Sequence, residues 1–61
     1  MATELEIRKE QRGMLFELLE AQKASQAENK VLNIMIVRYR TKMMEEDVAL
    51  VEKNFKSVYP D

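Results

Sequence analysis

A heptad pattern in the second half of the sequence constrains the fold more than any other feature. From Ile34 to Val58, apolar residues recur at alternating steps of three and four, and Thr41 is the single polar exception. A repeat of about 3.5 residues is typical of a helix that packs along one seam against another helix. The positions of the pattern are Ile34, Val37, Thr41, Met44, Val48, Val51, Phe55 and Val58.

A second apolar line runs beside this seam in steps of seven, through Ile36, Met43 and Leu50. A helix with two apolar lines can face its own chain with one and a partner chain with the other. We therefore predict an oligomer seam that binds a partner. Its residues are Ile34, Val37, Met44, Val48, Leu50, Val51, Phe55 and Val58.

The size of the chain also points to a partner. With 61 residues we expect one domain at most, and a chain of this size buries only about 60% of the surface that it exposes when unfolded. The sequence contains no cysteine and no histidine, so neither disulfides nor the usual zinc ligands can stabilise it. Oligomerisation is the remaining means, and a homodimer is expected.

Local signals divide the sequence into two helices. Thr3 and Glu6 form a capping box, which predicts the start of a first helix. Ser25 and Glu28 form a second capping box just before the apolar run that opens the heptad region. The predicted elements are a first helix over about 3–23, a turn at about 24–25, a second helix over about 26–58 and a tail at 59–61.

The predicted fold class is all-α, with 1–61 as a single helical-hairpin domain. At 1.5 Å per residue the first helix would be about 31 Å long and the second about 50 Å. Antiparallel pairing would then cover the heptad seam only as far as Met44, and residues from Val48 onward would need a second chain. We expect two hairpins to form a four-helix bundle or a coiled-coil dimer. The alternative is a single long helix in a coiled coil, because no Gly or Pro lies near the predicted turn.

The charges leave nucleic acid as an alternative partner. Ten basic and eleven acidic residues give a net charge of −1, which provides no long-range attraction to phosphates. Arg38, Arg40 and Lys42 nevertheless surround Tyr39, and cations beside an aromatic ring can bind a single strand. A regulator that binds RNA as a helical bundle, as Rop does, is the corresponding function by analogy of fold alone. The simpler interpretation is that Arg38 and Arg40 flank the core and face acidic residues such as Glu45 and Asp47.

Catalysis is not expected from these residue types. Without His or Cys there is no nucleophile–base pair of the usual kind, and we predict no cofactor and no metal site. The dense acidic cluster at Glu45, Glu46 and Asp47 is expected to be a solvated helix face. No apolar run is long enough for a membrane span or a signal peptide, and a cytoplasmic location is the default. The predicted function is a small helical module that binds proteins, as an adaptor or an inhibitor of a larger protein.

Overall fold

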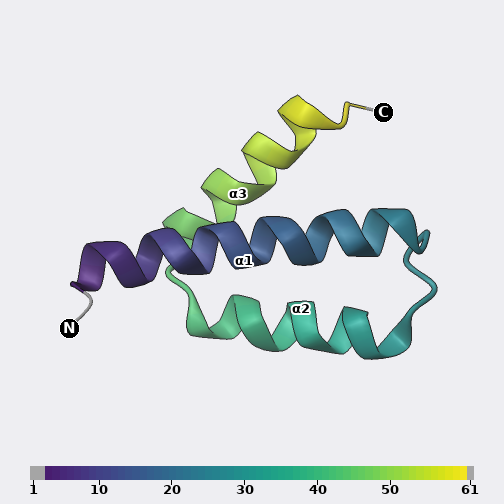
Figure 1. Cartoon of the computed structure of the whole chain (residues 1–61), viewed down its shortest axis with the longest axis horizontal. Helices are drawn as coiled ribbons and strands as arrows, with labels where there is room; N and C mark the ends of the chain where they lie inside the picture. The colour runs from purple at the N-terminus through teal and green to yellow at the C-terminus, as the bar shows by residue number, and fades with distance from the viewer. Residues whose placement is uncertain (1–2, 61) are drawn as a thin grey trace.

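Three helices make up the described part of the chain in the computed structural model, which describes residues 3–60. They are α1 (Glu4–Ala24), α2 (Lys30–Lys42) and α3 (Glu45–Val58). Figure 1 shows α1 and α2 lying side by side in opposite directions, with α3 crossing α1 at an angle. The all-α class is therefore confirmed, but the fold has three helices in place of the two that were predicted. Of the predicted tail, Asp61 lies outside the described residues, as do Met1 and Ala2.

The first helix begins where its capping box predicts. The Thr3 hydroxyl accepts a hydrogen bond from the backbone N–H of Glu6 at 3.1 Å. Glu4 and Glu6 also place negative charge at the positive end of the helix dipole. The C-terminal end of α1 differs by a single residue from the predicted 23, because Ser25 closes the helix through its N–H to the Ala21 carbonyl.

The predicted second capping box does not form. Gln26 and Ala27 have φ angles of 57° and 60°, in the left-handed region, so the chain cannot continue as a helix there. The next helix begins instead at Lys30, and its cap is Asn29, whose side chain accepts the Leu32 N–H at 3.0 Å. Serine at position 25 therefore ends one helix and does not start the next.

The predicted second helix is broken in the middle. Met43 and Met44 have extended backbones, with ψ angles of 158° and 142°, so the helix stops at Lys42 and restarts at Glu45. Neither residue is a Gly or Pro, so the break is not a local steric necessity. It allows α3 to fold back on α1, and the acidic first turn of α3 suits the positive end of a new helix dipole.

The core forms where the three helices meet. The apolar residues that are almost fully buried are Leu15, Leu19, Ile36, Met43 and Val51. Val48 and Phe55 pack against this core, so the expectation that the seam from Val48 onward lacks a neighbour in its own chain was wrong for Val48, Val51 and Phe55. The physical reason is the break: α3 gains cover from α1, and burial of each such side chain is worth about 1.5–3 kcal/mol.

Candidate interaction surface

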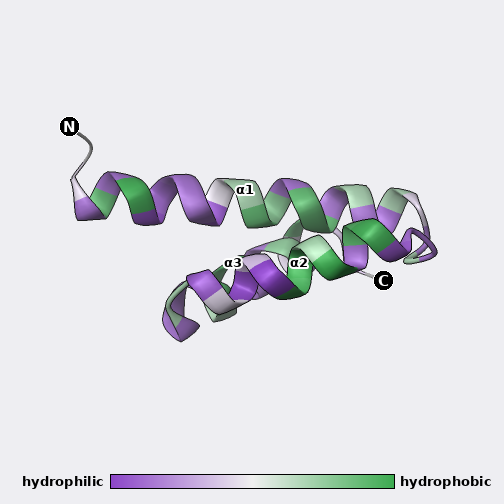
Figure 2. Ribbon diagram, turned by 90° about the horizontal axis from the view of Figure 1, so that it is seen from below, coloured by the Kyte–Doolittle hydropathy of each residue, from purple (hydrophilic) through white to green (hydrophobic). Residues whose placement is uncertain are grey.

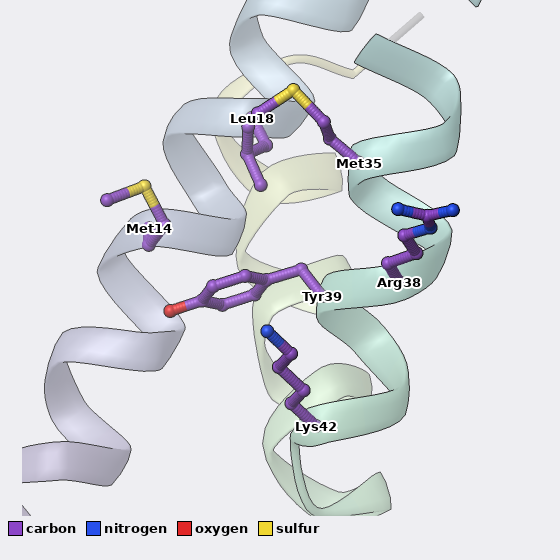
Figure 3. Close-up of a pocket in the computed structure, with 6 residues that line it drawn as sticks. All are labelled: Met14, Leu18, Met35, Arg38, Tyr39 and Lys42. Carbon is purple, nitrogen blue, oxygen red and sulfur yellow. The ribbon is translucent and has the colours of Figure 1, made fainter. Parts of the chain in front are cut away.

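A groove between α1 and α2 is one of the concave features of the described chain. It encloses about 310 Å³ and is lined by Met14, Leu18, Met35, Arg38, Tyr39 and Lys42. Figure 3 shows Leu18, Met35 and Tyr39 in the space between the two helices, with α3 passing behind them. Met14 lies over α1 and Arg38 over α2 (Figure 3). The floor of the groove is apolar and aromatic, whereas two cations of α2 stand at one side of it. Such a groove suits an apolar partner that carries negative charge at its edge.

The outer face of α2 carries more apolar surface than a solvated helix needs. Val31 is 68% exposed, Ile34 52%, Met35 50% and Val37 62%. A shallow hollow of about 310 Å³ lies on this face, beside Ile34, Val37 and Arg38. Figure 2 shows strongly apolar segments along α2. The sequence predicted two apolar lines along this stretch, and in the structure only the line through Ile36 reaches the core.

The basic residues of α2 do not form one continuous patch. Arg38 and Lys42 both line the groove. Arg40 instead lies near α3, where its guanidinium is 3.9 Å from the Glu52 carboxylate. Its Nε is buried and has no hydrogen-bond partner among residues 3–60. The nucleic-acid site predicted at Arg38, Arg40 and Lys42 is thus divided between two sides of the helix.

No protein-family model matches this chain, and no curated protein or solved structure does so either. The site must therefore be interpreted from its own geometry. Within residues 3–60, no group of three or more His, Cys, Asp or Glu side chains could hold a metal ion. No helix in the same range is long and apolar enough to cross a membrane.

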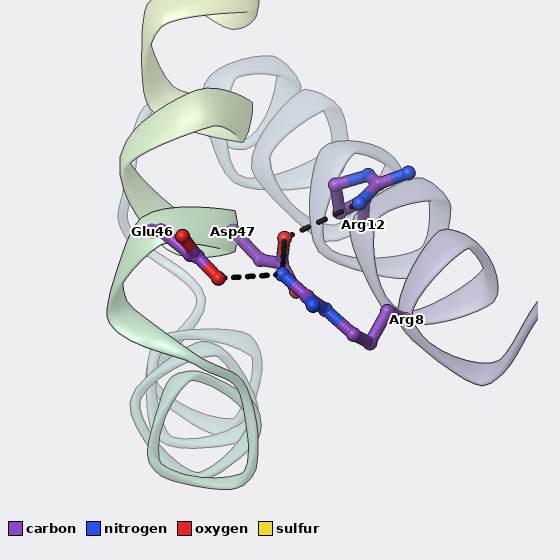
Figure 4. A network of polar contacts seen from close by, with 4 residues as sticks. All are labelled: Arg8, Arg12, Glu46 and Asp47. Atoms are coloured by element: carbon purple, nitrogen blue, oxygen red, sulfur yellow. Dashed lines mark hydrogen bonds and ion pairs between the residues drawn. The ribbon is translucent and has the colours of Figure 1, made fainter. Parts of the chain in front are cut away.

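An ion-pair network attaches the start of α3 to α1. The Arg8 guanidinium donates to both carboxylate oxygens of Asp47, at 2.8 and 3.0 Å, and to Glu46 at 2.8 Å. Arg12 donates to Asp47 at 3.2 Å. Figure 4 shows the carboxylate of Asp47 between the two arginines. Asp47 is only 2% exposed, so the expectation of a solvated acidic face was wrong for this residue.

The same network shifts the acidity of its members. The hydrogen bonds from Arg8 hold the pKa of Asp47 below its ordinary value of 3.8, although burial opposes this. The hydrogen bond to Asp47 raises the pKa of Arg8 in return. Arg8 and Arg12 thereby hold α3 on α1 through Asp47.

The C-terminal end of α3 packs on α1 through aromatic rings. The centroid of Phe55 lies 5.6 Å from that of Phe16 and 4.9 Å from that of Tyr59. The Tyr59 hydroxyl donates a hydrogen bond to the Glu20 carboxylate, and this bond raises the pKa of Tyr59. Phe55 and Tyr59 therefore contact their own chain, while Val58 stays exposed.

The predicted oligomer seam is divided by this fold. Val48, Val51 and Phe55 belong to or pack against the core. The exposed members are Ile34, Val37, Met44, Leu50 and Val58, for which partner binding stays a prediction. The heptad pattern did not reveal that Met14 and Leu18 of α1 share a groove with Met35 and Tyr39 of α2. Their i, i+4 spacing on each helix is the signal from which this groove could have been inferred.

Proposed function

We propose that this chain is a small helical interaction module without catalytic activity. In this proposal it associates with itself through the exposed side of α2 and the adjoining groove, and it acts as an adaptor or an inhibitor of a larger protein. The observation that carries the proposal is the apolar outer face of α2, where Val31, Ile34, Met35 and Val37 are all at least half exposed. Contiguous apolar surface of this kind, rimmed by charge, is typical of protein-binding sites.

The test is the mass of the chain in solution. Sedimentation velocity at micromolar concentration is expected to give at least two chains per particle. Met35→Glu should lower that mass, because Met35 lies on the exposed side of α2 and lines the groove, and it is not part of the buried core. Leu5→Glu is the matched control, since Leu5 is 71% exposed and lies in the first turn of α1, away from α2. A wild-type chain that sediments as a folded monomer would contradict self-association.

A nucleic-acid binder is the second candidate, because α2 holds Lys30, Arg38, Arg40 and Lys42 and no acidic residue. The division of Arg40 from Arg38 and Lys42 speaks against a single phosphate-binding surface. RNA binding by this site should be measurable at low salt and fall steeply as salt rises. Unchanged binding by the Arg38→Ala/Arg40→Ala double variant would exclude this site.

A further inference from the structure

The two edges of the groove between α1 and α2 carry opposite charges. On α1, Glu10 and Glu17 lie four residues before and three residues after Met14, so they stand on the same side of the helix. On α2, the cations Arg38 and Lys42 line the groove directly. All four charged residues are exposed, and no ion pair of their side chains is found within residues 3–60.

The register of the two helices brings these charges to similar heights along the groove. The Gln22 amide of α1 donates to the Asn33 side chain of α2 at 2.8 Å. Glu17 lies five residues before Gln22 on α1, and Arg38 lies five residues after Asn33 on α2. Because the helices are antiparallel, Glu17 and Arg38 are at a similar height. Glu10 and Lys42 follow toward the open end of the pair, within about one helical turn of each other in height.

We propose that two copies of the chain pack groove against groove about a two-fold axis parallel to α1 and α2. Each α1 then lies across from the α2 of the other copy, and heights along the axis are preserved. Glu17 of one copy faces Arg38 of the other, and Glu10 faces Lys42, with each pair occurring twice. The inference rests on the self-association proposed above and specifies its surface and its orientation.

Charge selects this arrangement over the other symmetric one. A two-fold axis across the helices would set α2 against α2, and α2 contains four basic residues and no acidic residue. It would also set the acidic edge of α1 against its own copy. Juxtaposed like charges weaken an interface. With the two-fold axis parallel to the helices, the charges that face each other are of opposite sign.

The apolar floor of the groove fits the same arrangement. Met14, Leu18, Met35 and Tyr39 of both copies would form the centre of a layer of four helices. Methionine side chains adapt to one another in such a layer. α3 passes behind the groove (Figure 3). Met14 and Met35 are 45% and 50% exposed, so this side of the α1–α2 pair is open.

The test exchanges the charges of one edge at a time. The Glu10→Lys/Glu17→Arg variant has two basic edges, and the Arg38→Glu/Lys42→Glu variant has two acidic edges. Each variant alone is expected to associate at least about tenfold more weakly than the wild type. A mixture of the two should form a one-to-one heterodimer, because all facing charges become opposite again. Sedimentation measures the association, and circular dichroism checks that each variant is folded.

Lys53→Glu/Lys56→Glu is the control, since it changes the net charge as much as the acidic variant does but lies on α3. It should associate as the wild type does. A wild-type dimer whose variants also dimerise separately, or do not combine when mixed, would overturn this orientation and leave self-association intact. A monomeric wild type would overturn both this orientation and the proposed self-association. A monomer whose groove binds an acidic amphipathic peptide would overturn them as well, because the occupant of the groove would then be a foreign helix.

Discussion

α2 and α3 are close in length, with 13 and 14 residues, and both pack on α1, yet they use their apolar residues differently. α3 turns Val51 into the core and attaches Asp47 to α1. α2 buries Ile36 but leaves a wide apolar face in contact with solvent. The comparison indicates that α3 completes the fold of the single chain, whereas α2 has surface that this chain does not cover.

Their charges differ in the same way. The first turn of α3 is acidic, and Asp47 in it is neutralised by Arg8 and Arg12 within the chain. Within residues 3–60, the cations Arg38 and Lys42 of α2 have no such internal anion. Substitutions that are matched between the two helices can therefore separate groups that hold the fold from groups that meet a partner.

The largest difference in stability is expected between alanine substitutions at two valines, one on α3 and one on α2. Val51→Ala should lower the free energy of unfolding by about 2 kcal/mol, because two buried methyl groups are lost and a cavity is left. Val37→Ala should change it by no more than about 0.5 kcal/mol, since Val37 is 62% exposed and alanine favours helices. Urea denaturation measured at a concentration where the chain is monomeric checks both values. Equal losses would contradict the assignment of α3 to the core and of the Val37 side of α2 to the surface.

Asp47→Asn should lower the free energy of unfolding by less than Val51→Ala does, because the guanidinium groups that lose their anion keep some contact with water. The lowered pKa of Asp47 means that its carboxylate stabilises the fold at pH values above 3.8. That contribution disappears as the pH falls through 3.8 toward the lower pKa of the folded state. Thermal melts should therefore separate the variant from the wild type at pH 7 and converge at strongly acidic pH.

Glu46→Gln is the control for this experiment. Glu46 also accepts from Arg8, but its side chain is 67% exposed, and exposed ion pairs contribute little. The variant should melt close to the wild type at pH 7. A pH-independent difference between Asp47→Asn and the wild type would show that packing, and not charge, is lost.

The smallest expected effect is a gain in stability from a substitution at the boundary between α2 and α3. Met44 is the N-cap of α3 and makes no side-chain cap hydrogen bond. Met44→Ser should raise the free energy of unfolding by about 1 kcal/mol, because a serine hydroxyl can accept a free N–H of the first turn. Met44→Ala lacks that acceptor and is the control in urea denaturation. If serine destabilised the chain relative to alanine, the break would not be a capped helix start in solution.

Local chemistry predicts part of this fold well. The start of α1 follows from Thr3 and Glu6, which form their cap within a single turn. The approximate position of the first turn follows from the polar stretch near Ser25. Even there, the use of Asn29 and not Ser25 as the cap depends on the left-handed conformation of Gln26 and Ala27, which these residue types do not predict.

The break at Met43 and Met44 could not be predicted from propensity. Both residues favour helices, and the heptad pattern passes through them without interruption. A straight helix keeps every backbone hydrogen bond, whereas the broken one buries Val51 against α1. This choice depends on contacts between distant segments, so it reverses the expectation for the seam: Val51 is covered, and Ile34 is exposed. Arg38 and Lys42 were identified from the sequence, but their groove partners on α1 depend on the same tertiary contacts.

The Arg8–Asp47 contact joins residues that are 39 apart in the sequence, and this has a consequence for the order of folding. Closing so long a loop costs more chain entropy than closing the short loop between α1 and α2. We infer that α1 and α2 pair early and that α3 docks last. By the same reasoning α3 is the first element to detach in the native state, so its backbone amides should exchange with deuterium faster than those of α1 near Leu15. Uniform exchange across the three helices would instead indicate that the whole chain opens as one cooperative unit.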